Sequence, residues 1–175
     1  MTSKKNIYRY NVKLRPINLK RDMSKMLKWY SNKKVLYYSE GHTTPYNEKI
    51  ITKMYNSITK DGHQKVIEKM HDSITKNGHM YIIEILSGNK WLSIGDASFT
   101  RTSTPITIGI PEYWGKGIGS QALRLLMKKA KHYHWKELKV SGIATYNKRS
   151  LRMYKNAGFK VTNKNKKEVK MILRL

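Results

Sequence analysis

The stretch IGIPEYWGKGIGSQALRLLMKKA, residues 108–130, decides the fold of this chain. It joins a short apolar segment to an amphipathic helix through three alternating glycines, Gly115, Gly117 and Gly119. Because glycine has no Cβ, backbone N–H groups can turn toward one point and an anion can approach them closely. The helix expected to begin at Gly119 adds its unpaired amides and the positive end of its dipole. The pattern predicts a diphosphate site between a strand and a helix.

Length and composition indicate one domain. The 175 residues suffice for a single core, and one domain is expected over residues 1–175. No apolar run approaches the roughly 20 residues of a membrane span, and the N-terminal MTSKKNIYRY lacks the apolar core of a signal peptide. A cytoplasmic protein without membrane association is therefore expected. The absence of cysteine excludes disulfides, thiolate metal sites and a cysteine nucleophile, and no metal site is predicted.

The chain is strongly basic, with a formal charge of +25 from 36 lysines and arginines against 11 acidic residues. Such a charge attracts polyanions, including nucleic acid, ribosomes and CoA, and repels free polyamines unless acidic groups reverse the field locally. The lysines are spread along the whole chain rather than gathered in one block. A weak association with nucleic acid or ribosomes is one expectation, and a solvated lysine-rich surface is the alternative.

Periodicity predicts a mixed order of strands and helices. Strands are predicted where apolar residues alternate or cluster, over residues 8–15, 80–86, 91–100, 106–110, 138–144 and 169–175. Helices are predicted from Asp22 to near Asn32, after the glycines, and over 150–156 with Gly158 closing the last. The helix after the glycines is expected to bury Ile118, Ala122, Leu125, Leu126, Ala130 and Tyr133. Residues 37–46, YYSEGHTTPY, are predicted to form a loop at the ligand site.

A tandem repeat interrupts this order. KIITKMYNSITKDGHQ, residues 49–64, is followed at once by KVIEKMHDSITKNGHM, residues 65–80, and ten of the sixteen positions are identical. Two copies are too few for a solenoid. The repeat therefore predicts two similar helical segments that end at Gly62 and Gly78. Neutral slippage and selection for a new acceptor surface both remain open as its origin.

A second motif makes the glycine-rich stretch more specific. PEYWGKGIGSQAL, residues 111–123, is followed by TYNKRSLRMYKNAGF, residues 145–159. The pair resembles the two acetyl-CoA motifs of the GCN5-related N-acetyltransferases. It is most similar to the branch that contains the ribosomal-protein N-terminal and aminoglycoside 6'-acetyltransferases, in which a tyrosine-tryptophan pair precedes the glycines. The resemblance implies an α+β domain whose central, mostly antiparallel twisted sheet carries helices on both faces and a V-shaped cofactor cleft.

The same resemblance implies a cosubstrate, acetyl-CoA, and a site for it. The main chain of Ile108, Gly109 and Ile110 would pair with the pantetheine arm. The amides from Gly115 to Ser120 would hold the diphosphate with added charge from Lys116, Asn147 would bond a pantetheine amide, and Ser150 would start or cap its helix. Trp114 stands where the family has arginine or glutamine. The implied cofactor residues are Ile108, Gly109, Ile110, Gly115, Lys116, Gly117, Ile118, Gly119, Ser120, Asn147, Ser150 and Tyr154.

Direct attack of an amine on the thioester, within a ternary complex, is the implied reaction. Tyr154, the Ile110 amide and Asn147 are the implied catalytic groups. The Tyr154 phenol would protonate the departing thiolate, and the Ile110 amide would stabilise the developing oxyanion. No covalent enzyme intermediate is needed, because holding both substrates together supplies much of the rate. For the base that deprotonates the amine, the candidates are Glu112, Asp96, Glu84, Glu40, His42 and a water chain.

Several alternatives stay open at this level. A protein or peptide amine fits the basic surface as acceptor, and an aminoglycoside or another small-molecule amine is the alternative. In another class, the chain would be a non-catalytic module that binds CoA or nucleic acid. Residues 117–122 also satisfy a dinucleotide fingerprint, but they lie two thirds along the chain and no acid ends the next predicted strand. A monomer and a homodimer are both compatible with the sequence.

Overall fold

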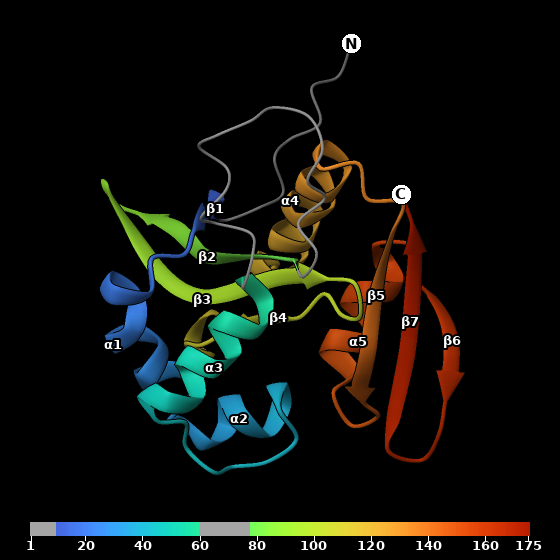
Figure 1. The fold of residues 1–175 in the computed structure, drawn as a ribbon, viewed down its shortest axis with the longest axis horizontal. Coiled ribbons are helices and arrows are strands. Elements are labelled where there is room, and N and C mark those ends of the chain that lie inside the picture. Colours follow the sequence, from blue (N-terminus) through green and yellow to red (C-terminus); the bar gives the residue numbers. More distant parts are fainter. Residues whose placement is uncertain (1–9, 60–77) are drawn as a thin grey trace.

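The structure is a computed structural model that describes residues 10–59 and 78–175 (Figure 1). Within these residues the strands form two antiparallel sheets, ordered β1-β2-β3-β4 and β5-β7-β6. The strands are β1 (Val12–Pro16), β2 (Gly78–Ser87), β3 (Lys90–Thr100), β4 (Ile106–Ile108), β5 (Glu137–Ala144), β6 (Lys160–Lys164) and β7 (Glu168–Arg174). The helices are α1 (Leu19–Trp29), α2 (Lys33–Ser39), α3 (Glu48–Thr59), α4 (Ile118–His132) and α5 (Lys148–Asn156), with a 3-10 turn, η1, at Pro111–Tyr113.

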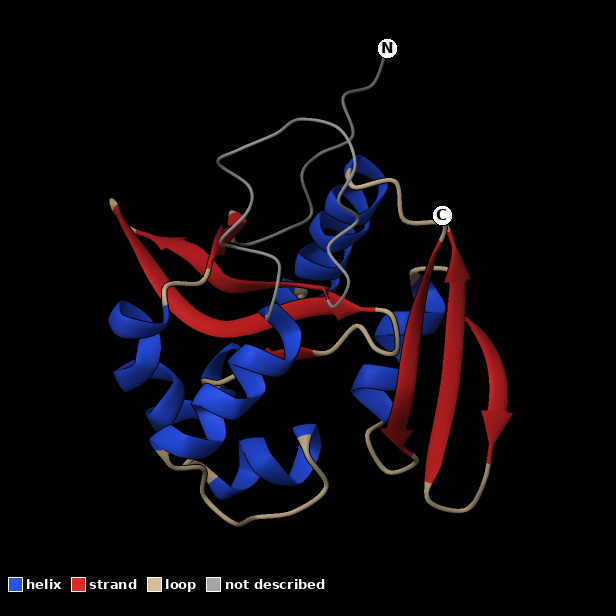
Figure 2. Ribbon diagram, in the orientation of Figure 1, coloured by secondary structure: helices blue, strands red, loops and turns tan. Residues whose placement is uncertain are grey.

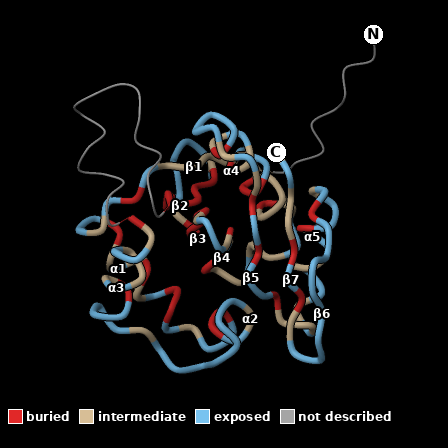
Figure 3. Tube along the Cα trace, turned by 45° about the vertical axis from the view of Figure 1, so that its right-hand side comes forward, coloured by how far each residue is buried: buried red, intermediate tan, exposed pale blue. Residues whose placement is uncertain are grey.

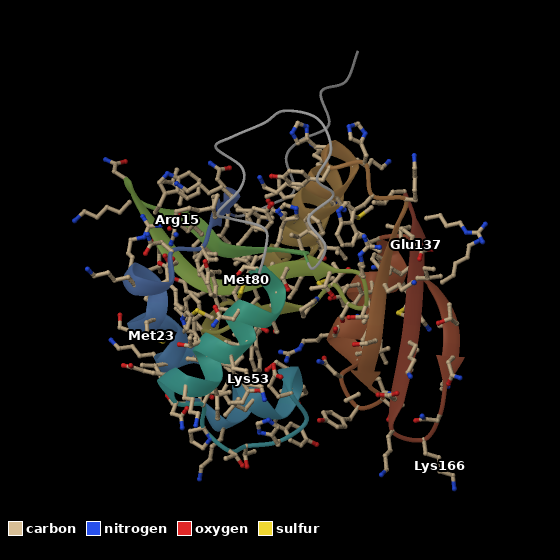
Figure 4. The ribbon with its side chains drawn as sticks, in the orientation of Figure 1. Arg15, Met23, Lys53, Met80, Glu137 and Lys166 are labelled. Atoms are coloured by element: carbon tan, nitrogen blue, oxygen red, sulfur yellow. The ribbon has the colours of Figure 1, made fainter. Side chains whose placement is uncertain are left out.

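Helices cover both faces of the first sheet (Figure 2). Successive residues of a strand point to opposite faces, so Ile82 packs with Met26 and Ile51 from α1 and α3, while Ile83 packs with Leu126 from α4. Met80, labelled in Figure 4, belongs to the same side as Ile82, where α3 crosses β2. Because both faces are covered, β2 is buried along most of its length (Figure 3). The predicted α+β fold with helices on both faces is confirmed.

The sequence did not predict two of the elements, β6 and α2. The strand β6 carries the sequence KVTNK and all five of its residues are exposed, so no apolar alternation marks it. The helix α2 replaces the first part of the predicted loop over residues 37–46. It forms because the Asn32 side chain accepts hydrogen bonds from the amides of Lys34 and Val35, which caps its first turn.

The ends of three helices correct the predictions. Asn18 caps α1, and Asp22 lies inside the helix, buried against the Arg15 guanidinium at 2.9 Å, rather than opening it. Helix α4 begins at Ile118 and buries Leu123, whereas the predicted Leu125 is half-buried and Tyr133 is 41% exposed.

Helix α5 begins at Lys148, two residues before the predicted start. Its cap is Asn147, whose Oδ1 accepts from the Ser150 amide at 3.2 Å. The predicted capping role of Ser150 is therefore wrong, because Ser150 supplies only the amide that is capped.

Residues 49–59 of the first copy of the repeat fold as part of α3, Glu48–Thr59. The predicted second helical segment and the predicted stop at Gly62 lie outside the described residues, as does the start of the strand predicted from Tyr8. Gly78 begins β2 with a φ of 144°, where a Cβ would approach the Phe99 carbonyl oxygen. The close approach of β3 therefore accounts for this glycine, and the helix predicted to end there lies outside the described residues.

The two sheets meet at one end of β4. There the Ser141 hydroxyl of β5 lies 3.1 Å from that of Ser103, just before β4. In the sheets themselves, β4 pairs with β3 and β5 pairs with β7. Within the described residues β4 and β5 share no backbone hydrogen bonds as paired strands. The edge of β4 is therefore left open toward α5.

Candidate active site

A cavity of about 330 Å³ lies along the open edge of β4. Its walls come from β4, from the turn that leads into α4, from α5 and from α2. Eight residues predicted for the cofactor site line it: Ile108, Gly115, Gly117, Ile118, Gly119, Ser120, Asn147 and Ser150. The fold thus gathers two motifs that lie some thirty residues apart in the chain.

The glycine turn has the backbone that an anion cradle needs. Gly115 and Gly117 take φ values of 74° and 77°, in the left-handed region where a side chain is strained. Gly117 is the N-cap of the fifteen-residue helix α4 and has no side chain, so the N-cap position supplies no hydrogen bond to the first-turn amides. Gly119 serves packing, because a Cβ there would lie 2.9 Å from the Met153 sulfur of α5.

The main chain at the end of β4 differs from the prediction in part. The Gly109 amide donates to the Ile94 carbonyl at 2.7 Å, so it belongs to the sheet and is directed away from the open edge. A Cβ on Gly109 would overlap the Trp29 ring. The predicted pantetheine pairing of Gly109 is therefore wrong for its amide. The Ile108 carbonyl faces the cavity side and accepts from the Trp114 indole N–H at 2.7 Å.

Three other predicted residues lie off the cavity wall. Lys116 is exposed, with its ammonium 5.4 Å from the centre of the Tyr113 ring. Ile110 packs between the two cores, and its carbonyl accepts from the Tyr113 amide. Tyr154 is 3% exposed and its hydroxyl donates to the Thr104 carbonyl at 2.5 Å, and this burial raises its pKa.

The last turn of α2 is clasped to the loop before α5. The Tyr146 hydroxyl donates to the Tyr37 carbonyl at 2.7 Å, and Asn147 Nδ2 donates to the Tyr38 carbonyl at 2.9 Å. Carbonyls at a helix C-terminus have no partner within the helix, so these donors satisfy them. Asn147 thereby fixes both the start of α5 and the α2 wall, a double role that its predicted pantetheine contact did not include.

An aromatic group forms the far wall. The Arg149 guanidinium lies 4.1 Å from the Trp114 ring centre and 4.9 Å from that of Tyr38, and the two rings pack edge to face. This places a positive charge beside the cavity, and no carboxylate of the part of the chain that the structure describes pairs with it. Sequence reasoning missed several of the lining residues. On α5, Arg149, Arg152, Met153 and Asn156 follow one another at spacings of three and four residues, a helical pattern that could have found them together. On α2, Tyr38 and Ser39 lie in the segment predicted to border the ligand, residues 37–46, but no signal marked Val35.

The candidate general bases differ in their burial and in their ion pairs. Glu84 forms ion pairs with Arg15 and Lys13, and although burial raises its pKa, their hydrogen bonds lower it further, so it stays charged. Glu40 and His42 are exposed, accepting from the Tyr46 hydroxyl and the Thr44 amide, and Glu112 is exposed. Asp96 alone of the candidates is buried without an ion pair among the described residues.

The profile of one family spans the cavity and both motifs. It is described as an acetyltransferase (GNAT) domain and matches residues 11–160. The chain belongs to the GNAT acetyltransferase family. The resemblance and the enzyme class predicted from the sequence, an N-acetyltransferase that uses acetyl-CoA, are confirmed at the level of the family. A search of curated proteins gives no sequence match to this GNAT acetyltransferase.

Solved structures share the GNAT fold over nearly the whole chain. A domain from Methanocaldococcus jannaschii superposes with a TM-score of 0.75 and 21% identity, covering 95% of this chain and 99% of that one. The aminoglycoside acetyltransferase AAC(6')-Ib in complex with coenzyme A gives 0.68 and 14%, covering 94% and 95%. The PaiA N-acetyltransferase of Thermoplasma acidophilum with coenzyme A gives 0.60 and 15%, covering 94% and 99%. No helix in residues 10–59 and 78–175 has the length and apolar character of a membrane span.

Proposed function

We propose that this GNAT acetyltransferase moves the acetyl group of acetyl-CoA to a primary amine by direct attack in a ternary complex. The observation that carries the proposal is the glycine cradle at the start of α4. Its uncapped amides open onto a cavity that the β4 edge and α5 also line. A diphosphate suits this cradle because helix N-terminal amides and the helix dipole both stabilise an anion.

Successive parts of the cavity wall suit successive parts of acetyl-CoA, from the diphosphate to the pantetheine arm. The amides from Gly115 to Ser120 hold the diphosphate, and the exposed Lys116 adds charge from outside the wall. The main chain of Ile108 and Ile110 is left to pair with the pantetheine arm, since Gly109 bonds to β3. Asn147 acts by setting the α5 terminus and the α2 wall. Bound acetyl-CoA supplies an activated acyl carbon, and the cavity holds it beside the acceptor.

Tyr154 and Ile110 keep their predicted roles as part of the proposal. The Ile110 amide is the oxyanion donor. The Tyr154 phenol is the donor to the departing sulfur, and its raised pKa keeps it protonated. Because its hydroxyl now bonds the Thr104 carbonyl, this role requires a rotation of the hydroxyl toward the cavity. Tyr154→Phe should lower kcat while leaving CoA affinity unchanged, because the ring packing against Phe159 remains.

The acceptor is proposed to be a protein or peptide amine. A formal charge of +25 repels free polycations, whereas a peptide amine carries little charge of its own. An aminoglycoside is the second candidate, favoured by the fold shared with AAC(6')-Ib, which has been solved with coenzyme A and kanamycin. A non-catalytic module that binds CoA or nucleic acid is the alternative of another class. Weak association with ribosomes, a cytoplasmic location and one domain over residues 1–175 remain part of this proposal.

One screen separates these candidates. Purified protein is incubated with acetyl-CoA and, in turn, kanamycin, spermidine and short peptides with free amino termini, and released thiol is measured. Acetylation of peptides above kanamycin supports the proposal, and the reverse order supports the aminoglycoside alternative. CoA binding by calorimetry without thiol release from any amine would leave only the non-catalytic module. Titration with RNA at two salt concentrations tests the basic surface, since phosphate contacts weaken steeply with salt.

A further inference from the structure

Asp96 is a buried carboxylate that forms no ion pair with any residue of the ranges 10–59 and 78–175. It is 5% exposed, and both of its oxygens lie within hydrogen-bond distance of the Tyr30 hydroxyl, at 3.0 and 3.2 Å. The other buried acids behave differently, because Asp22 and Glu84 each contact Arg15. Burying a carboxylate without a cation is costly, and none of the basic residues that the structure describes pairs with this one.

Tyr30 connects Asp96 to the cavity wall. Its hydroxyl lies 3.4 Å from the Thr107 hydroxyl, and Thr107 lines the cavity. Asp96 and Thr107 are paired residues of β3 and β4, so their side chains lie on the same face of the sheet, toward α1. The Tyr30 hydroxyl thus lies between the Asp96 carboxylate in the core and the hydroxyl of Thr107, a residue of the cavity wall. The Thr107 end of these three groups lies near α2, on the side opposite the core that packs against α4.

We propose that Thr107, Tyr30 and Asp96 form a proton path that takes the proton of the acceptor ammonium, with Asp96 as its terminal acceptor. The inference rests on the proposed function and deepens it by naming the base. Thr107 is the member at the cavity, where the amine or one intervening water reaches it. Asp96 and Tyr30 act through Thr107 and are positioning residues for this transfer.

The protons balance along the path. The ammonium gives one proton to Thr107, the Thr107 hydroxyl proton passes to Tyr30, and the Tyr30 proton passes to Asp96. The amine is then neutral and Asp96 is a neutral acid. The C–N bond forms and the C–S bond breaks, Tyr154 gives its proton to the leaving sulfur and takes up the second amine proton, and the Asp96 proton returns to solvent along the same groups. Acetyl-CoA and an ammonium thus become an amide, CoA and one proton.

The charges around Asp96 suit an acceptor that works near neutral pH. Burial raises the pKa of Asp96 to about 7, the Tyr30 hydrogen bond opposes this rise, and the Glu40 charge adds to it. The titratable groups beyond Tyr30 are Tyr46, stacked on its ring and bonded to Glu40, and His42, whose ring lies 5.7 Å from that of Tyr46. Burial also keeps the pKa of Tyr30 well above its usual value, so Tyr30 relays a proton without becoming charged.

The test compares Asp96→Asn with the unchanged protein on the fastest peptide of the screen. Asn keeps an oxygen for the Tyr30 hydroxyl but cannot take a proton. The unchanged protein should lose kcat as the pH falls below about 7, because Asp96 becomes protonated. Asp96→Asn should lower kcat about 100-fold at pH 8 and remove this acid limb. With hydroxylamine, an acceptor already neutral at pH 7, the two proteins should have similar rates.

A second variant and a direct titration separate this inference from the proposed function. Thr107→Val should lower the peptide rate as Asp96→Asn does while the Asp96 carboxyl still titrates near pH 7 by carbon NMR. Glu40→Gln, which removes the nearby exposed acid, should keep the acid limb. An Asp96 that titrates below pH 5, or an acid limb that survives in Asp96→Asn, would overturn the path even if the unchanged protein acetylates peptides. Failure of every amine in the screen would instead overturn the proposed function.

Discussion

The two long walls of the cavity are built by different means. The wall at the start of α4 presents main chain, with left-handed glycines and helix amides whose N-cap, Gly117, has no side chain. The wall at α2 presents side chains, held in place by hydrogen bonds from Tyr146 and Asn147 to residues 109 positions away in the sequence. The first wall depends on backbone conformation, and the second depends on long-range contacts.

This difference assigns separate tasks to the two walls. Every residue has the same amide, so a main-chain cradle keeps its ligand chemistry while its exposed side chains change. A wall of Tyr38, Trp114 and Arg149 changes shape and charge with each substitution. We therefore expect substitutions in the cradle to affect the binding of CoA most, and substitutions in the α2 wall to affect it less.

The largest effect is expected from Gly117→Asp. A side chain at a φ of 77° is strained, and the added carboxylate would lie against the bound diphosphate. CoA affinity should fall about 100-fold by calorimetry. The matched control is Gly88→Asp, at a φ of 58° in the β2–β3 turn, where a Cβ meets no atom within 4 Å. It carries the same strain and charge and should bind CoA like the unchanged protein. Equal losses in both would mean that net charge acts, and not the cradle.

A smaller effect is expected from Asn147→Ala, which breaks the clasp. The substitution removes the α5 cap and the bond to the Tyr38 carbonyl, so the free energy of unfolding should fall by about 1–2 kcal/mol. CoA affinity should fall about tenfold, because the α2 wall loses its attachment. Asn18→Ala removes only the cap of α1, which lies away from the cavity lining, and serves as the control. It should lose comparable stability by thermal unfolding and keep its CoA affinity; a loss of affinity in both would assign the effect to stability alone.

The same contrast explains what the sequence could predict. The cradle is local: its glycines, the strand before it and the helix after it occupy one stretch of residues 108–130. The structure assembles them in the predicted order, although α4 begins at Ile118 and the Gly109 amide bonds to Ile94. The buried strands β2 and β3 were equally visible, because apolar residues fill them.

Residues 37–46 were placed at the ligand site from the sequence, but the helical form of α2 was not visible, for a physical reason. Residues 37–39 carry no apolar periodicity, and their helix depends on the Asn32 cap and on donors that come from the loop before α5. The path from Thr107 to Asp96 likewise needs Tyr30 from another element. Such contacts between distant segments leave no local pattern, so Asp96 was one candidate base among several until the fold placed it.

The smallest effect is expected from Trp114→Phe. Trp114 lies where the two walls meet. The indole N–H donates to the Ile108 carbonyl, a group that the proposed pantetheine pairing also uses. If the indole competes for this carbonyl, its removal should strengthen CoA binding about fivefold, which corresponds to one hydrogen bond of about 1 kcal/mol. Phenylalanine keeps an aromatic face for Arg149. The measurement is CoA affinity by calorimetry.

Trp91→Phe is the control for this change, because Trp91 is 42% exposed on β3 and lies outside the cavity lining. It should leave CoA affinity unchanged. A weaker rather than stronger affinity in Trp114→Phe would mean that the indole serves as wall more than as competitor. The tryptophan would then belong with the side-chain wall, and the Ile108 carbonyl would lie outside the part of the β4 edge that binds pantetheine. A stronger affinity would mean that the Ile108 carbonyl binds pantetheine. The main-chain part of the binding site would then extend from the cradle along β4.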